Sequence, residues 1–325
     1  MIVDVHNHYY PPGYMDALKK GPSAVHITTD AEGNPLLHYP GDYNVAVRGH
    51  RDIAYRETAI AKAGIDRQVV TLTTPGVHVE TPQRAIELAR LVNDEFAQVR
   101  RDRGKHFTAL ATLPLNDPAA SVVELTRAVT DLHLPGAMLF SNVNGVPLAD
   151  ARFDPLYAEA DRLGCVLHIH PTNPVNVDAM QEYWLMPLVG FLFDTTLAAA
   201  HLVFAGVMHR YRRIKWVMSH LGGALPYLAE RLDRGWEAFP ACRAQIDRPP
   251  SEYLKRCFYD TVNFNPGALK LAVDFAGADH VLAGSDYPHQ IGSMDTMMNV
   301  LKSLSVSPSE REQILGKKAE ELYTL

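Results

Sequence analysis

The sequence predicts an α/β fold, a closed barrel of eight parallel strands, and two observations support that prediction. Short β-branched runs alternate with amphipathic helical stretches along most of the 325 residues. The predicted strands are largely apolar on both faces, as expected where helices cover the outside of a parallel sheet. Eight strands alternating with helices fit a (β/α)8 TIM barrel better than an open doubly wound sheet. Because the sequence contains no linker-like segment rich in Pro, Ser or Gly between two domains, we expect one domain over residues 1–325.

The predicted elements follow one another in regular alternation. The strands are residues 2–8, 67–73, 107–112, 137–140, 166–170, 215–220, 257–260 and 280–284. The main helices between them are residues 82–103, 118–132, 154–163, 225–238, 266–275 and 294–304.

Two regions fall outside this alternation. Residues 11–50 are rich in Gly, Pro, Asp and Asn, and we expect an insertion after the first strand that lies over the barrel mouth. Residues 171–195, after the fifth strand, form a second long excursion with four aromatic residues: Tyr183, Trp184, Phe191 and Phe193. Long loops at this face of a barrel usually serve the active site.

Composition excludes several classes of function. Hydrophobic residues make up 47% of the chain and charged residues 21%, and the formal charge is −6, so nucleic acid is not an expected partner. Three separated cysteines, Cys165, Cys242 and Cys257, indicate a reducing compartment and argue against a thiolate zinc site. We find no signal peptide, and the apolar stretch 185–207 is interrupted by polar residues, so it is expected to be a buried helical region. A cytoplasmic protein with no membrane partner is therefore expected.

Imidazole and carboxylate side chains lie at the ends of four predicted strands. The strand ends DVHNH, VLHIHPTNP, WVMSHLGG and VLAGSDYPH supply His6, His8, His170, His220 and Asp286. His6 and His8 share a face because strand side chains alternate. Barrel enzymes build their sites from the C-terminal strand ends, so these side chains should converge. Imidazole nitrogen and carboxylate oxygen suit zinc and similar divalent ions, which take about four such ligands.

Each of these residues also has a purely structural explanation. A single histidine at a strand end is more often a hydrogen-bonded polar residue than a ligand, and Asp286 before Tyr-Pro fits a turn. The prediction of a metal therefore depends on the joint pattern. We expect His168, one layer deeper than His170, to support the core or the ligands, and His289 to contact substrate. Other histidines lie in polar, loop-like sequence and need no role in the site: His26, His38, His50 and His78.

Two other classes of enzyme lack their motifs in this sequence. Ser219-His220 and Ser285-Asp286 bring serine beside acid–base residues, but the GxSxG turn of the serine hydrolases is absent. Gly222-Gly223 follows a strand, yet neither GxGxxG nor GxxxxGK[ST] occurs, so nucleotide binding is not expected.

The same motifs carry a family resemblance. DVHNH, the HP after the fifth strand, SHLGG and GSDYP resemble the metal-dependent decarboxylase branch of the amidohydrolase superfamily, in its aminocarboxymuconate-semialdehyde decarboxylase-like group. The similarity runs through most of the chain and is densest from EYWLMPLVGFLFDTT to GSDYPH. The resemblance implies one divalent ion, usually zinc with manganese possible, bound by His6, His8, His170 and Asp286. It also implies that His220 is the catalytic histidine.

The resemblance further implies a homodimer, and the departures from it concern the substrate. Arg231 matches an arginine that reaches into the neighbouring subunit's pocket to hold a substrate carboxylate, although a surface ion pair with Glu230 or Asp233 is its simpler explanation. The stretch GAMLFSN has no lysine, consistent with one metal. Asn44 stands where the decarboxylase has a substrate-binding arginine, and His289 replaces a phenylalanine. The substrate's second carboxylate is therefore expected to be absent or held differently.

These residues suit more than one reaction. Loss of CO2 without an organic cofactor leaves electron density on carbon, which a metal can stabilise as a Lewis acid. His220 can then deliver a proton, and Asp286 serves as ligand and as a catalytic hydrogen-bonding partner. Our first hypothesis is a non-oxidative decarboxylase of an aromatic or muconate-semialdehyde-type carboxylate. The alternatives are a metal-dependent hydrolase or hydratase of a related carboxylate, amide or lactone, and a barrel that only binds its ligand.

Overall fold

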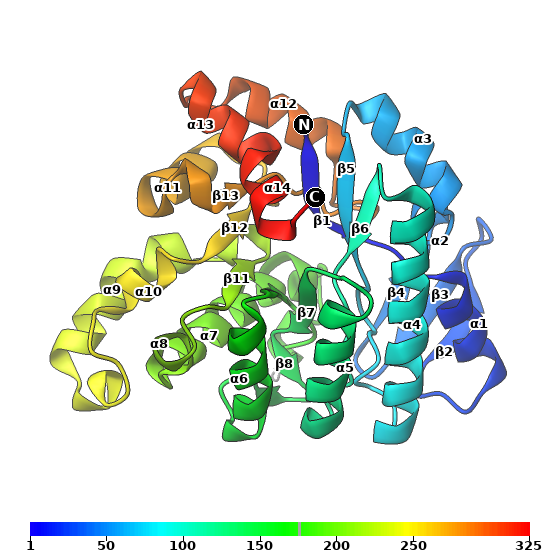
Figure 1. The fold of residues 1–325 in the computed structure, drawn as a ribbon, viewed down its shortest axis with the longest axis horizontal. Helices are drawn as coiled ribbons and strands as arrows, with labels where there is room; N and C mark the ends of the chain where they lie inside the picture. Colours follow the sequence, from blue (N-terminus) through cyan, green and yellow to red (C-terminus); the bar gives the residue numbers. More distant parts are fainter. Residues whose placement is uncertain (175–176) are drawn as a thin grey trace.

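The computed structural model describes residues 1–174 and 177–325, and in them eight parallel strands surround the barrel axis (Figure 1). The predicted TIM barrel is confirmed. The strands are β1 (Val3–His8), β5 (Arg67–Thr71), β6 (Phe107–Ala109), β7 (Gly136–Phe140), β10 (Val166–His170), β11 (Lys215–Met218), β12 (Phe258–Asp260) and β13 (Val281–Leu282).

Backbone hydrogen bonds close the barrel at two seams. The strands pair in the orders β1-β5-β6 and β7-β10-β11-β12-β13. A bridge between Ala111 and Ala137 joins the two groups on one side. On the other side, the Val5 amide donates to the Ala283 carbonyl at 2.9 Å. Because all eight strands run in parallel, their C-terminal ends meet at one mouth.

Helices cover the outside of the barrel. The longer ones are α3 (Ile53–Ala63), α4 (Pro82–Arg103), α5 (Pro118–Thr130), α6 (Asp154–Leu163), α7 (Phe191–Phe204), α9 (Leu225–Ala238), α11 (Pro266–Ala276) and α12 (Met294–Ser303). Shorter helices are α8 (Val207–Arg210), α10 (Pro250–Leu254), α13 (Pro308–Glu312) and α14 (Lys318–Tyr323). In α4, Leu88, Val92 and Phe96 recur every four residues and are buried, so one stripe faces the strands.

The segment between β1 and β5 carries secondary structure of its own. It contains α1 (Pro12–Lys20), an antiparallel sheet of β2 (His26–Thr29), β3 (Pro35–Tyr39) and β4 (Asp42–Val45), and the short helix α2 (Arg48–Arg51). Helix α1 packs against α4, and both are drawn at the right of Figure 1. Residues from β3 and β4 line the cavity at the barrel mouth, beside His170 and His220.

The second excursion, residues 171–195, lies partly outside the described residues, at 175–176. Its described part leads through a π-helical turn, Met186–Gly190, into α7. Tyr183 and Trp184 have positive φ angles and side chains that are 80% and 57% exposed.

The continuous helical stretch Met186–Phe204 is long and apolar enough to cross a membrane by length and composition alone. Its 18-residue window has a mean hydropathy of 1.5, and 44% of that window is buried inside the structure. Ala198, Ala199, Leu202 and Val203 form its buried side and belong to the barrel core. These contacts are those of a helix in the barrel wall. The other side of the helix carries Phe193 and Leu197, which are 56% and 53% exposed, so the predicted burial holds for one side only.

Candidate metal centre and active site

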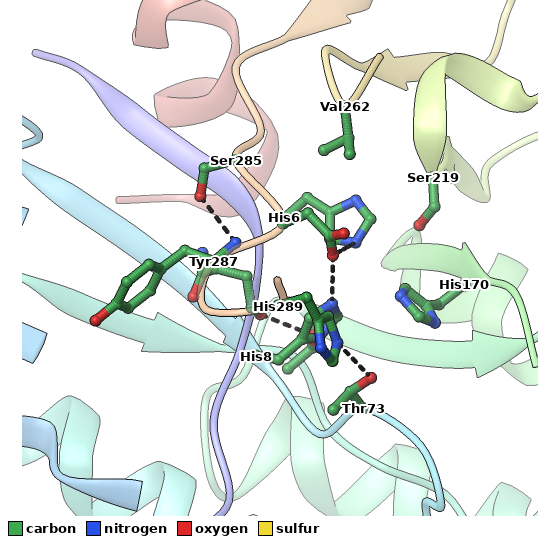
Figure 2. A network of polar contacts seen from close by, with 12 residues as sticks. His6, His8, Thr73, His170, Ser219, Val262, Ser285, Tyr287 and His289 are labelled. Atoms are coloured by element: carbon green, nitrogen blue, oxygen red, sulfur yellow. Dashed lines mark hydrogen bonds and ion pairs between the residues drawn. The ribbon is translucent and has the colours of Figure 1, made fainter. Parts of the chain in front are cut away.

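Three histidine rings meet at the ends of β1 and β10. His6 and His8 point the same way from β1 and are 1% and 0% exposed. Their ring centroids are 5.1 Å apart. His170, the last residue of β10, lies 5.2 Å from the ring of His6 and 4.7 Å from that of His8. Figure 2 shows the three rings gathered at one place, so the convergence expected at the strand ends occurs.

Asp286 brings a carboxylate to the same place from the segment after β13. Its Oδ1 lies 3.3 Å from His6 Nε2 and 3.2 Å from His8 Nε2. Burial alone would raise the pKa of Asp286, but contacts with His220, His6 and His8 hold this pKa well below its usual range. The Asp286 amide donates to the His6 carbonyl at 2.8 Å, which fixes the turn against β1. A carboxylate therefore faces the imidazoles in its charged form.

Each of the three imidazoles is held at Nδ1 and presents Nε2 to the centre. The partners of Nδ1 in His6, His8 and His170 are Asp260 Oδ2 at 2.5 Å, Thr71 Oγ1 at 3.0 Å and the Pro171 carbonyl at 2.8 Å. Thr71 donates its own proton to the Asn7 carbonyl at 3.0 Å, so Thr71 Oγ1 accepts from His8. Metal-binding histidines are usually oriented by such contacts at the other ring nitrogen.

The charges and unpartnered atoms of this group fit a divalent cation. Among the described residues, the buried Nε2 atoms of His6 and His170 have no hydrogen-bond partner. Burial holds the pKa values of His8 and His170 well below the usual range, which favours the neutral, ligating form. The lone pair of neutral His8 Nε2 then faces the Asp286 carboxylate at 3.2 Å, an arrangement that a cation between them stabilises.

The geometry offers two choices for the fourth ligand. One atom each from His6, His170, His220 and Asp286 lies within 4.8 Å of the others. His8 groups in the same way with Asp286 and His289. His8 has its Nδ1 anchored by Thr71, whereas Nδ1 of His220 is buried without a partner. This difference favours His8 over His220 as the fourth ligand.

His220 follows β11 in an unusual backbone turn. It begins the 3-10 turn His220–Gly222, and its φ of 53° lies in the left-handed region. Its Nε2 is 3.9 Å from Asp286 Oδ2. Gly223, with a φ of 62°, allows α7 to come close, because a Cβ there would lie 2.1 Å from the Leu192 carbonyl oxygen. The SHLGG sequence thus places an imidazole beside the other histidines under tight packing.

The structure adds Asp260, which the sequence analysis did not identify as a site residue. This fully buried carboxylate ends β12 and accepts from the amides of Leu221 at 3.3 Å and Val262 at 2.9 Å. Burial opposes a charged His6, but Asp260 and Asp286 outweigh burial and raise the pKa of His6 to about 10. Asp260 is the last residue of a predicted strand. The rule that strand-end side chains meet at the barrel mouth, which identified Asp286, therefore also applies to Asp260.

His168 lies beside Asp260 and below the ligand layer. Its Nε2 is 3.0 Å from Ser219 Oγ and 3.8 Å from Asp260 Oδ2. Its position agrees with the supporting role expected from the sequence.

Two histidines assigned to polar loops are in fact buried. His50 and His78 are 1% and 3% exposed. His50 lies in the short helix α2 and not in a loop, whereas His78 lies outside the helices and strands, as its sequence suggested, but is buried. The segment that follows β1 folds back on the barrel and brings His50 to 5.0 Å from the ring of His289. His289 in turn lies 4.7 Å from His8, with its Nε2 3.3 Å from Thr73 Oγ1 (Figure 2).

A cavity of about 370 Å³ opens above these side chains. Its walls include His170, His220, Asp286 and His289, together with apolar and polar residues of the two excursions: Tyr39, Asp42, Asn44, Trp184, Leu188 and Phe191. The amide of Asn44 donates to Tyr10 Oη at 2.6 Å and to the Thr74 carbonyl at 3.2 Å. Arg231 instead lies on the exposed surface of α9, and it is not part of the described cavity wall.

The chain is similar to known proteins over most of its length. A model of the amidohydrolase family matches residues 3–325. The chain is 35% identical over 245 residues to 2-amino-3-carboxymuconate-6-semialdehyde decarboxylase of Dictyostelium discoideum, covering 75% of this chain and 68% of that protein. It is 30% identical over 304 residues to gamma-resorcylate decarboxylase of a Rhizobium species, covering 88% and 92%.

Solved structures show the same barrel. The crystal structure of 2,6-dihydroxybenzoate decarboxylase complexed with 2,6-dihydroxybenzoate matches with a TM-score of 0.81 at 25% identity, covering 100% of this chain and 99% of that one. 5-Carboxyvanillate decarboxylase from Sphingomonas paucimobilis matches with a TM-score of 0.88 at 23% identity, covering 100% and 99%. The second likeness concerns the fold alone.

Proposed function

The chain belongs to the amidohydrolase family, and on this premise we propose that it is a metal-dependent, non-oxidative decarboxylase of an aromatic or muconate-semialdehyde-type carboxylate. The observation that carries the proposal is the convergence of His6, His8, His170 and Asp286 beside His220 at the barrel mouth. These residues alone allow a hydrolase as well. The decarboxylases named among the relatives support the lyase.

The proposed mechanism divides the work between the ligands and His220. His6, His8, His170 and Asp286 would hold a divalent ion, which when bound would supply Lewis-acid stabilisation of the charge left when the carbon–carboxylate bond breaks. His220 delivers a proton to the carbon that has lost CO2, the general-acid role that imidazole most often fills. Asp286 Oδ2, 3.9 Å from His220 Nε2, orients that ring.

We propose zinc as the ion, with manganese as the alternative. Three imidazoles and one carboxylate are a ligand set that zinc commonly takes, and manganese accepts the same donors. Metal analysis of the purified protein decides between them, and we expect about one ion per chain.

The test of the function combines metal analysis with product analysis. The metal-loaded protein is supplied with a panel of hydroxybenzoates and muconate semialdehydes in H2¹⁸O, and CO2 release and label in the organic product are measured. Release of CO2 with no ¹⁸O in the organic product supports the decarboxylase. Label in the product without CO2 shows the hydrolase or hydratase instead. Binding of these carboxylates with neither reaction shows a barrel that only binds.

We propose further that the active form is a homodimer in which Arg231 crosses the interface. Apolar side chains on α7 and α9 lie open to solvent in the single chain: Phe193 is 56%, Leu197 53% and Tyr227 78% exposed. Arg231 lies one helical turn beyond Tyr227, on the same side of α9. Asp233, one candidate for a surface ion pair, accepts instead from the Ser251 amide at 2.8 Å. A second copy would cover the apolar side chains and place Arg231 at its neighbour's cavity.

Mixing two inactive variants tests this arrangement. His220→Asn and Arg231→Ala dimers should regain activity when they exchange subunits, because one heterodimer site would hold an intact His220 and the partner subunit's Arg231. Arg234→Ala is the matched control, since Arg234 is 72% exposed on the same helix and pairs with Glu237. It should be fully active alone. Full activity of Arg231→Ala, or no recovery despite demonstrated exchange, would exclude this role.

We also infer a cytoplasmic location. The three cysteines are free, and two of them, Cys165 and Cys257, are buried in the barrel, in keeping with a reducing compartment.

A further inference from the structure

Away from the metal centre, the described wall of the cavity carries a negative charge and no positive one. In the described part of its wall, the carboxylates are Asp42 and Asp286, and neither lysine nor arginine is present. Asp286 belongs to the metal centre. Asp42 is therefore a second negative charge that the proposed chemistry does not use.

Asp42 is built into the cavity edge. It is the first residue of β4 and pairs with Tyr39 of β3 across the antiparallel ladder. Tyr39 Oη donates to Asp42 Oδ2 at 3.1 Å. Asp42 is half-buried, and burial raises the pKa of its carboxyl group.

The rest of the wall offers apolar surface rather than a counter-charge. Trp184, Pro187, Leu188, Phe191 and Ile291 line the cavity and suit the faces of an aromatic ring. Asn44 is neutral, and its amide nitrogen is already engaged by Tyr10 and Thr74. The metal centre and the partner subunit's Arg231, both proposed above, would hold the same carboxylate of the ligand. A second carboxylate on that ligand would meet Asp42 in a half-desolvated cavity whose described wall holds no lysine or arginine to balance it.

We propose that Asp42 is a specificity-determining residue that makes the cavity bind ligands with a single carboxylate more tightly than dicarboxylates. The proposal rests on the proposed function only in taking a carboxylate as the ligand of the metal centre. Like charges brought together at a binding site reduce affinity strongly, so we expect the charge of Asp42 to account for about a tenfold preference.

Binding of two inert probes tests the proposal without turnover. Dissociation constants of benzoate and of benzene-1,3-dicarboxylate are measured by calorimetry at pH 8 on metal-loaded protein. Wild type should bind benzoate the more tightly. Asp42→Asn should tighten the dicarboxylate about tenfold and leave benzoate unchanged, whereas Asp42→Glu should keep the wild-type ratio. Asp16→Asn is the matched control. Asp16 is 60% exposed on α1 and does not line the cavity, so this substitution removes one negative charge at a site away from the cavity.

The outcomes separate this proposal from the proposed function. If no carboxylate is decarboxylated but the ratio of the two dissociation constants changes in Asp42→Asn as expected, the proposed decarboxylase function is wrong and the proposed role of Asp42 stands. If decarboxylation occurs and the ratio is the same in wild type and Asp42→Asn, the selectivity is wrong and the function stands. Absence of benzoate binding, equal binding of both probes by wild type, or an equal effect of Asp16→Asn also overturns the role of Asp42.

Discussion

The metal centre and the rim of the cavity are built in different ways. The centre consists of buried side chains at the ends of barrel strands, and three of its imidazoles are anchored at Nδ1. The rim comes from the segments after β1 and β10, where Asn44 is half-buried and Trp184 is 57% exposed. A barrel wall holds reacting groups in fixed positions, whereas connecting segments can vary without loss of the fold. If the proposed function holds, the strand ends supply the reacting groups and the connecting segments select the substrate.

The largest effect should follow from removing a strand-end ligand. His170→Ala leaves the ion with three ligands, and we expect metal affinity to fall by more than the roughly 100-fold typical of lost supporting contacts. Turnover should fall with it. Metal analysis after dialysis measures the change, with His26→Ala, an exposed histidine of β2, as control. If His170→Ala retains the wild-type metal content, His170 at the end of β10 is not a metal ligand.

Next in size is the loss of the proton donor. His220→Asn should keep about one ion per chain and lose turnover by at least about 10²-fold, the usual contribution of a general acid–base group. Metal content and turnover are measured on the same sample. A variant that loses its metal would show His220, rather than His8, to be the fourth ligand.

A smaller effect is expected one layer deeper. Asp260→Asn replaces the carboxylate that orients His6 through a 2.5 Å contact with Nδ1. Metal affinity should fall about 10- to 100-fold, as is typical when the group behind a metal-binding histidine is changed. Titration with a competing chelator gives the affinity, and circular dichroism checks the fold. Unchanged affinity in a folded variant would make Asp260 a residue of the core alone.

The smallest effect should come from the rim. Asn44→Ala removes hydrogen bonds to Tyr10 and Thr74 that hold the cavity wall, each worth about 1 kcal/mol. We expect KM to rise about fivefold, with metal content and kcat close to wild type. A variant that loses metal instead would contradict the division between centre and rim.

The sequence predicts the metal centre better than it predicts the rim of the cavity. The strand-end residues could be brought together because strands have a fixed period and barrel strands end at one mouth, so the convergence of His6, His8, His170 and Asp286 was predicted without coordinates. The bounds of α4, α6 and α9 were likewise predicted, from their amphipathic patterns.

The rim was less accessible to the same reasoning. His50 and His78 lie in sequence that has no strand or helix period, and their burial depends on how the segment after β1 packs on the barrel. The place of Asp42 at the cavity edge depends on the same tertiary packing. No local pattern encodes such contacts, since they join residues far apart in the chain. Asp260 is different. It ends a predicted strand, so the rule that polar strand-end residues meet at the barrel mouth could have identified it, but the sequence analysis did not apply that rule to this strand.

Location of the ion itself tests the central claim most directly. Crystals of the metal-loaded protein, measured at the absorption edge of the bound metal, should show one anomalous peak in each chain. We expect this peak at about 2.0–2.2 Å from Nε2 of His6, His8 and His170 and from a carboxylate oxygen of Asp286, with His220 outside bonding distance. A peak bonded to His220 in place of His8, or a second ion in the same chain, would contradict the account.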